Sequence, residues 1–374
     1  MAGGVRICAG TRTGLQLVDL SHGEPEVFGV AHHGEIIQVV TGSPGKLRNL
    51  YVGLADGLHK SEDGGTTWRR TLEGDVRSIT VDPSDECVIY AGTDPVHLYR
   101  SEDAGESWEE LISLQRLPQE THEKLGEFSP NDMSRNQEAS FRHRRQEWWI
   151  HPPYKGHVLY IFVHPDNPNY LMLCLEHGGI ALSTDRGESW EDASEGIDYL
   201  DIHYLTNMPQ HFDRFLVTSA RGLFETSDPR LGWTRAEEGC DRDYFHDLAI
   251  LPSTDGGDPV TLVATAEGSP GVWRRAARGS RAAVYRSHDF GKSWERVGAS
   301  NGLPEDMAAM VWAFGPHPSE PATVIAAIGE SSAVPSPERG IGSGSLVMTT
   351  DAGGSWRTLL DTPSAVEHLF VAAR

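Results

Sequence analysis

Histidine is the residue type in this sequence that best suits metal binding or acid–base chemistry. The chain contains 17 histidines, and four lie near the start of strand-like apolar segments: His157, His203, His246 and His368. Neutral imidazoles from separate strands are good ligands for zinc, copper, iron or manganese. Two alternatives remain open: a metal-free ligand or catalytic pocket, and hydrogen-bonded histidines with a structural role. A divalent transition metal is therefore one candidate cofactor, with these four residues as its ligands.

Charged residues occupy the same segments as the histidines. Asp75, Asp201 and Glu35 could act as acids, as bases or as groups that orient an imidazole. Together with His246 and Arg77 they are the candidate catalytic residues. A pair of carboxylates about the width of a sugar apart would favour glycosidase chemistry, but the sequence gives no such distance. The alternative for each carboxylate is a solvated loop position.

Tryptophan and arginine cluster in two segments that lack strand-like alternation. One covers about 112–156 and contains Trp149, and the other covers 268–281 and contains Trp273. In an otherwise acidic chain, clustered Arg and Trp favour capture of an anionic or aromatic small molecule, or of a protein. The alternative is that arginine stacked on tryptophan only fixes a loop. The candidate ligand-binding residues are therefore Arg77, His157, His203, His246, Trp312, His368, Trp149 and Trp273.

An octapeptide repeat indicates which elements position these residues. Its pattern is Ser/Thr-x-Asp-x-Gly-x-Ser/Thr-Trp. Clean copies lie at 61–68, 101–108, 183–190, 287–294 and 349–356, and a degraded copy lies at 226–233. The Asp carboxylate can accept hydrogen bonds from backbone N–H groups and from the Ser/Thr hydroxyls. Glycine permits a positive φ, and the Trp ring covers the turn from its apolar side. The repeat therefore predicts a structural hairpin turn.

Each copy lies within a unit of four strand-like segments. Around the first copy, for example, 49–53 and 57–60 alternate as strands do. Four antiparallel strands per repeat are typical of a β-propeller blade. Residues 5–18 match the middle strands of a unit and 366–371 match an inner strand. A blade shared by both termini would leave no exposed edge.

The predicted fold class is therefore all-β, a seven-bladed β-propeller of four-stranded antiparallel blades closed by strands from both termini. Six or eight blades are the alternatives. Residues 1–374 are predicted to form a single propeller domain, with insertion loops at about 112–156, 268–281 and 329–345.

Alignment of the seven inner strands superposes one position near their start. It holds Gln38, Arg77, Leu159, His203, His246, Trp312 and His368. His157, Asp75 and Asp201 lie two residues earlier, and two residues later every blade has an apolar side chain. Propellers bind ligands where their inner strands begin. The pattern thus predicts a pocket at the channel mouth with polar walls, converging histidines and an apolar floor.

The repeats resemble those of the Asp-box, or BNR-repeat, β-propellers, which include sialidases, xyloglucan hydrolases, the sortilin ectodomain and photosystem II assembly factors. The chain is most similar to bacterial stand-alone BNR-like propellers, over nearly its full length. The resemblance implies that the Asp boxes lie at the blade periphery and are structural. It also implies glycoside hydrolysis, because propellers of this family are often labelled glycosyl hydrolases. The Arg-Ile-Pro motif and arginine triad of sialidases have no match here. Xyloglucan hydrolases of this kind use a cleft between two propellers, and this chain is expected to form one.

The charge of the chain limits its partners. Asp and Glu number 54 against 32 Lys and Arg, a formal charge of -22, which repels phosphate backbones and anionic lipid. Neither nucleic acid nor a membrane is therefore an expected partner. Residues 1–10 lack the apolar stretch of a secretory signal, and the cysteines form no Cys-x-x-Cys pair. A cytoplasmic location follows as an expectation.

Two classes of function remain after these observations. The first is binding of a small ligand, anionic or aromatic, at the histidine-rich mouth, with an enzyme that uses a histidine-bound metal as one version. The alternative is a non-catalytic scaffold that presents a face to a protein partner, or a glycoside hydrolase as the family label has it. The expected assembly is a monomer or a small homo-oligomer.

Overall fold

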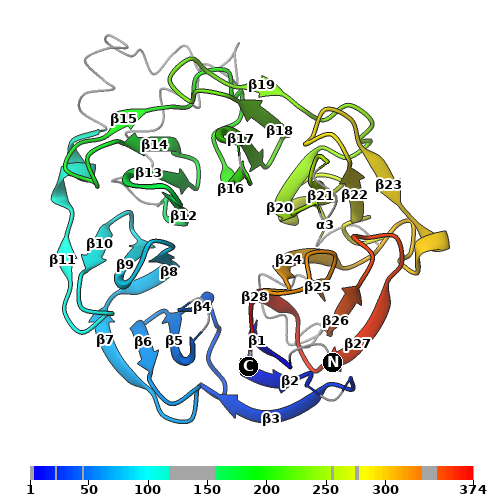
Figure 1. The fold of residues 1–374 in the computed structure, drawn as a ribbon, viewed down its shortest axis with the longest axis horizontal. Coiled ribbons are helices and arrows are strands. Elements are labelled where there is room, and N and C mark those ends of the chain that lie inside the picture. The colour runs from blue at the N-terminus through cyan, green and yellow to red at the C-terminus, as the bar shows by residue number, and fades with distance from the viewer. Residues whose placement is uncertain are drawn as a thin grey trace. The chain divides into compact units, whose positions relative to one another are not determined.

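The computed structural model describes residues 4–21, 23–43, 46–117, 156–209, 211–253, 257–273, 278–330 and 343–373. The described chain forms seven four-stranded antiparallel sheets (Figure 1). This confirms the predicted fold class, an all-β, seven-bladed β-propeller. Part of each predicted insertion lies outside the described residues, and Trp149 is among the residues left out.

The chain divides into two compact units. Unit 1 comprises Met1–Ala55, His59–Arg70 and Ala236–Arg374, and unit 2 comprises Asp56–Leu58 and Thr71–Arg235. Three complete sheets belong to unit 2, and the other four belong to unit 1 apart from a few residues of one sheet.

The sheets of unit 2 are built from consecutive strands. The first contains β8 (Asp75–Asp82), β9 (Asp85–Asp94), β10 (Leu98–Ser101) and β11 (Glu109–Glu110), followed by the short helix η1 (Ile112–Arg116). The second contains β12 (Val158–His164), β13 (Asn167–Leu175), β14 (Gly179–Ser183) and β15 (Glu191–Asp192). The third contains β16 (Ile202–Met208), β17 (His211–Ser219), β18 (Gly222–Thr226) and β19 (Thr234–Arg235).

Unit 1 has three sheets of the same kind. They are β4 (Val39–Ser43), β5 (Lys46–Leu54), β6 (Gly57–Ser61) and β7 (Arg69–Glu73); β20 (Tyr244–Leu251), β21 (Val260–Ala266), β22 (Ala283–Ser287) and β23 (Glu295–Val297); and β24 (Met310–Pro316), β25 (Val324–Gly329), β26 (Gly344–Thr349) and β27 (Arg357–Thr362). Two short helices, α3 (Pro270–Trp273) and η3 (Ala299–Asn301), lie in the connections.

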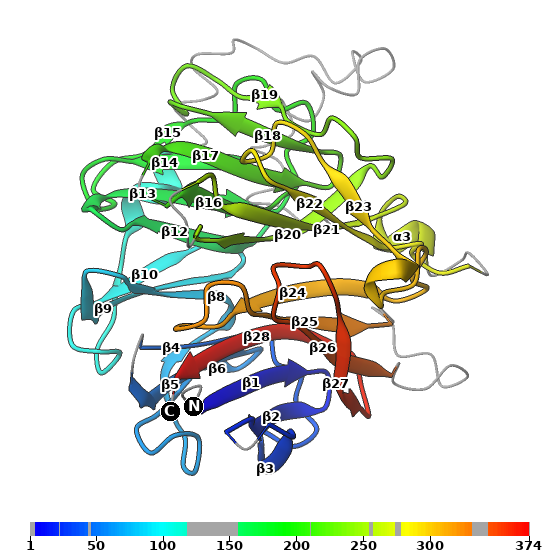
Figure 2. The same ribbon diagram turned by 45° about the vertical axis from the view of Figure 1, so that its right-hand side comes forward.

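The remaining sheet of unit 1 joins the two ends of the chain. Its order is β28 (Val366–Ala373), β1 (Val5–Thr11), β2 (Gly14–Asp19) and β3 (Glu26–Ala31). β28 runs antiparallel to β1 with Cys8 opposite Phe370, and Figure 2 shows the two strands side by side. The predicted blade shared by both termini is confirmed, because β28 is its first strand and β1 and β2 are its middle strands.

The Asp boxes form the hydrogen-bonded turns that the repeat predicts. In the first copy, Oδ1 of Asp63 accepts the hydroxyl of Ser61 at 2.9 Å and the backbone N–H of Thr67 at 2.8 Å. The hydroxyl of Thr67 donates to Oδ2 at 2.6 Å. These hydrogen bonds, those of Thr67 above all, lower the pKa of Asp63 to about 2. Gly65 has a φ of +92°, a conformation that favours glycine.

The hydrophobic cores lie between neighbouring sheets. In unit 2, one core contains Tyr90 and Leu98 of the first sheet and Ile161 and Leu173 of the second. The next contains side chains of the second and third sheets and the box residue Trp233, which is 4% exposed. Each box Trp of this kind thus adds its ring to the core that holds adjacent sheets together.

A β-bulge recurs near the start of the inner strands, at the position that the sequence alignment selected. The pairing skips one residue there, so its side chain is redirected relative to the regular strand. The skipped residues include Arg77, Leu159, His203 and Trp312, and in β20 both His246 and Asp247. In β28 the skipped residue is Glu367, so His368 lies one residue beyond the bulge.

Candidate metal and ligand site

Two sheets of unit 2 bring a cluster of imidazole and carboxylate groups together. His157 immediately precedes β12, and Asp201 immediately precedes β16. Glu176 and His177 form the turn between β13 and β14, where the N–H of Glu176 donates to the carbonyl of His157 at 3.0 Å. His177 has a φ of +56°, which is uncommon for a residue with a Cβ atom. The turn therefore fixes the backbone of both residues beside the start of β12.

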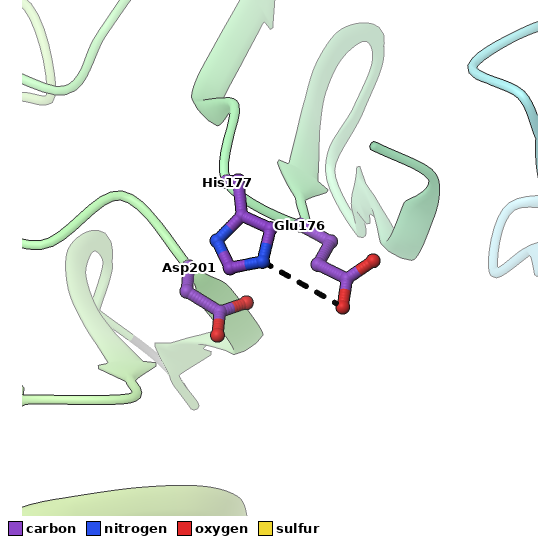
Figure 3. A group of neighbouring side chains, drawn as sticks. All are labelled: Glu176, His177 and Asp201. Carbon is purple, nitrogen blue, oxygen red and sulfur yellow. Dashed lines mark ion pairs between the residues drawn. The ribbon is translucent and has the colours of Figure 1, made fainter. Parts of the chain in front are cut away.

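The side chains of this cluster converge on one small volume. One ligand atom each of Glu176, His177 and Asp201 lies within 4.8 Å of the others, and Figure 3 shows the three side chains facing one another. The Nε2 atom of His177 is 4.0 Å from Oε1 of Glu176. A single ion about 2.1 Å from each ligand would need them within about 4 Å of one another.

Two further histidines lie beside the carboxylates of the cluster. His157 Nδ1 lies 2.6 Å from Oε2 of Glu176, which leaves Oε1 on the side of His177. His203 Nε2 lies 3.7 Å from Oδ1 of Asp201. Imidazole–carboxylate pairs of this kind orient metal ligands in many proteins.

Asp201 is kept ionised by its neighbours. Burial by itself would raise the pKa of its carboxyl, but His203, with smaller effects from His177 and His157, holds that pKa below its usual value. The Oδ1 atom is buried and accepts no hydrogen bond within the part of the chain that the structure describes. A buried anionic oxygen in this state has unused capacity to bind a cation.

The first sheet of unit 2 places Arg77 and Asp75 in a separate ion-pair group. Arg77 donates to Asp75 at 2.7 Å and lies 3.4 Å from Asp94, with about a third of its own side chain exposed (31%). Its charge is thus balanced by two carboxylates. Arg77 and Asp75 therefore remain predicted site residues.

His246 and Trp312 contact each other in unit 1. Their rings meet edge to face with centroids 5.1 Å apart, and Trp273 lies 6.0 Å from Trp312 and 5.1 Å from Tyr244. The indole N–H of Trp312 donates to the carbonyl of Gly329, and that of Trp273 to Glu267 and Gly268. This aromatic cluster is thus anchored to the backbone through its indole groups.

The other two predicted site residues of unit 1, His368 and Glu35, belong to different segments of the chain from the aromatic cluster. His368 is half-buried in β28 opposite Gly10, and Glu35 is exposed in the turn before β4. The predicted histidine set is therefore divided, with His157 and His203 in unit 2 and His246 and His368 in unit 1. Trp149 lies outside the described residues.

Glu176 and His177 are absent from the sequence-based candidates. Both lie in the turn between the second and third strands of a blade, whereas the alignment compared only inner strands. The signal that could have found them is a Glu-His pair directly before Gly178 and Gly179, at the point where an apolar strand ends. Turn residues at the end of a strand are frequent sites of function.

Similarity to known proteins agrees with this fold. A model of the BNR-Asp box repeat matches residues 284–297, which span β22, its turn and β23. No curated protein is significantly similar to the chain. Among the described residues, no helix is long and apolar enough to span a bilayer.

Several solved structures share the fold at low sequence identity. An ancestral GH74 enzyme is 16% identical with a TM-score of 0.56, over 90% of this chain and 38% of that one. The GH74 xyloglucanase from Xanthomonas campestris is 14% identical with a TM-score of 0.54, over 98% and 67% of the two chains. YCF48 bound to a D1 peptide is 14% identical with a TM-score of 0.50, over 87% and 82%. The chain thus spans well under half of the ancestral enzyme.

The repeats, the sheets and these similarities define the class. The chain is a BNR/Asp-box repeat β-propeller, related in fold to GH74 and YCF48 propellers.

Proposed function

We propose that this propeller binds a divalent transition metal ion through Glu176, His177 and Asp201, and that the ion holds a small ligand. The observation that carries the proposal is the convergence of one ligand atom from each residue within 4.8 Å. Three protein ligands leave coordination positions open, as in metal sites that bind substrates rather than in closed structural sites. The sequence analysis predicted His157 and His203 as metal ligands, whereas this proposal gives them the role of orienting the two carboxylates.

The ligand set favours a particular class of metal. Carboxylate oxygens suit magnesium, calcium and manganese, whereas imidazole suits zinc, iron, copper and nickel. One imidazole with two carboxylates is therefore best matched by Mn²⁺, Fe²⁺, Co²⁺ or Zn²⁺. The open positions would then accept a ligand atom or a water molecule.

Metal titration of the purified chain tests the proposal. Zn²⁺ and Mn²⁺ are added to metal-stripped protein, and binding is followed by calorimetry and by elemental analysis after desalting. We expect one ion per chain, with His177→Ala and Asp201→Asn each weakening binding at least about 100-fold. His157→Ala is expected to weaken it about 10-fold, because it removes an orienting group rather than a ligand.

His164→Ala is the matched control, since His164 ends the same strand that His157 precedes and its Nδ1 accepts the N–H of Asp166. This control should bind metal as the parent does. Metal binding that survives both His177→Ala and Asp201→Asn would refute the proposal. His246→Ala and His368→Ala test whether the two histidines of unit 1 contribute as the sequence predicts.

Glycoside hydrolysis is a second candidate. It is suggested by the carboxylates of Glu176 and Asp201, whose ligand atoms lie within 4.8 Å; retaining glycosidases have a separation of about 5–5.5 Å. Such an enzyme also needs one carboxyl group as its general acid, and this candidate assigns that role to Glu176. Release of nitrophenol from aryl glycosides, lost in Glu176→Gln, would support this candidate.

A protein-binding scaffold is the third candidate. YCF48, which shares the fold, has been solved with a bound D1 peptide. In this chain, the outer strand β3 exposes apolar side chains, with Val27 and Phe28 each 44% exposed and Val30 41%. Pull-down of a partner that Phe28→Glu abolishes, with metal binding unchanged, would favour the scaffold.

A further inference from the structure

Arg221 occupies the turn that corresponds to the one carrying His177. His177 follows β13 in the turn to β14, and Arg221 follows β17 in the turn to β18 of the next sheet. The two turns therefore present one imidazole and one guanidinium group from neighbouring blades of unit 2.

A single backbone segment links these two turns. The carbonyl of Leu200 accepts the N–H of Gly179, two residues after His177, at 2.9 Å. The carbonyl of Asp201 accepts the N–H of Ala220, the residue before Arg221, at 3.0 Å. The segment that ends in Asp201 is thus held between the two turns, so Arg221 lies beside the proposed metal ligands.

Stacking places the Arg221 side chain on the same segment. Its guanidinium carbon lies 4.9 Å from the ring centroid of Tyr199, two residues before Asp201. A guanidinium group over an aromatic ring keeps its N–H groups at the edge, where they remain able to donate. Arg221 is exposed, so a ligand can reach these donors from solvent.

Its charge is not balanced by a carboxylate of the described residues. On the same sheet, Arg214 pairs with Glu225 at 3.2 Å and Arg235 with Asp198 at 2.7 Å. Arg221 forms no ion pair among the residues that the structure describes. In a chain with a formal charge of -22, a cation without an internal counter-ion beside a metal site points to an anionic ligand.

We propose that Arg221 binds the free end of a small oxyanion, a carboxylate or a phosphate, whose other oxygen coordinates the metal. This inference rests on the proposed metal site and adds the ligand class. The planar guanidinium of arginine can direct two N–H groups at the free end of such an anion, whereas a lysine ammonium offers only a point charge. Arg221 is therefore a specificity-determining residue for the oxyanion.

Cobalt substitution separates the two levels of the proposal. Co²⁺ is titrated into the metal-stripped chain, and its visible absorption reports binding and coordination. Acetate and inorganic phosphate are then added in separate titrations, and a change in the Co²⁺ spectrum gives the dissociation constant of each anion. The anion with the lower constant identifies the preferred oxyanion.

We expect Arg221→Ala to weaken the preferred anion about 10- to 100-fold while changing Co²⁺ affinity less than about threefold. Arg221→Lys should recover only part of the loss. Arg214→Ala is the control, because Arg214 lies about 20 Å away along β17 and is already paired. It should leave both affinities unchanged.

Failure of Co²⁺ to bind the parent chain would refute the metal site itself. If Co²⁺ binds but neither anion alters its spectrum, or if Arg221→Ala binds the anion as the parent does, the oxyanion proposal is wrong and the metal site stands.

Discussion

Asp247 is a buried carboxyl group in β20 of unit 1. Its Oδ2 atom accepts the backbone N–H of Phe314, in β24, at 2.6 Å. Burial raises the pKa of Asp247 to about 7, although the N–H groups of Phe314 and Leu248 act in the opposite direction. The carboxyl is therefore protonated in the folded protein over a pH range in which it is ionised in the unfolded chain.

The sign of the effect on stability follows from proton binding. From the ordinary pKa of 3.8 up to the raised pKa of about 7, the folded state holds up to one more proton at Asp247 than the unfolded state. The free energy of unfolding therefore falls by about 1.4 kcal/mol per pH unit in this window and is level above it. Between about pH 5 and pH 7 the loss is two units times about 1.4, or about 3 kcal/mol, as an upper limit.

Asp247→Asn removes the titration and keeps an oxygen for the two N–H groups. The new amide group changes the free energy of unfolding by an amount that does not depend on pH. We expect the stability of the variant relative to the parent to rise by up to about 3 kcal/mol from pH 5 to pH 8. Urea unfolding followed by tryptophan fluorescence at both pH values measures this difference.

Asp258→Asn is the matched control, because Asp258 is exposed in the connection between β20 and β21 of the same sheet. Its stability relative to the parent should be the same at both pH values. If Asp247→Asn also shows no change with pH, the carboxyl is not protonated in the folded state and the reasoning from burial is wrong.

Two further substitutions test the packing between blades. Gly92→Ala would place a Cβ atom 2.4 Å from that of Val158 on the next sheet, and overpacking of this kind costs about 1–3 kcal/mol in urea unfolding; Gly29→Ala, whose nearest contact is 3.4 Å, should be close to neutral. Trp233→Phe removes a 2.8 Å hydrogen bond to the buried carbonyl of Ala193, and the expected loss is about 1–3 kcal/mol. Trp68→Phe, which loses a bond to Gly65 within its own turn, should lose less in the same assay.

The fold was largely predictable because its repeat has a local cause. The hydrogen bonds of Asp63 join residues within four positions of it, so the same short pattern makes the same turn in the five blades that carry a clean copy. The strands beside each turn could likewise be located from alternation, and the terminal strand beginning at Val366 was assigned to the blade of β1 on that basis. Local chemistry thus predicted the four-stranded kind of blade and favoured seven blades over six or eight.

The candidate site was predictable only where it lies on the inner strands. His157, Asp201 and His203 were found because their positions repeat from blade to blade. Glu176 and His177 were not, because a turn with a positive φ brings them to Asp201 across two sheets. No periodic signal marks such a contact.

The sequence by itself determined the Asp-box turns and the four-strand repeat, since both depend on interactions between near neighbours or on strand alternation. It also indicated the blade shared by the termini, because a closed ring leaves no strand edge unpaired. Only the tertiary structure decided which polar groups meet. A bulge adds one residue without changing the apolar pattern around it, as at Glu367 before His368. The direction of each side chain at the start of an inner strand therefore depends on pairing between strands, which composition and spacing do not record.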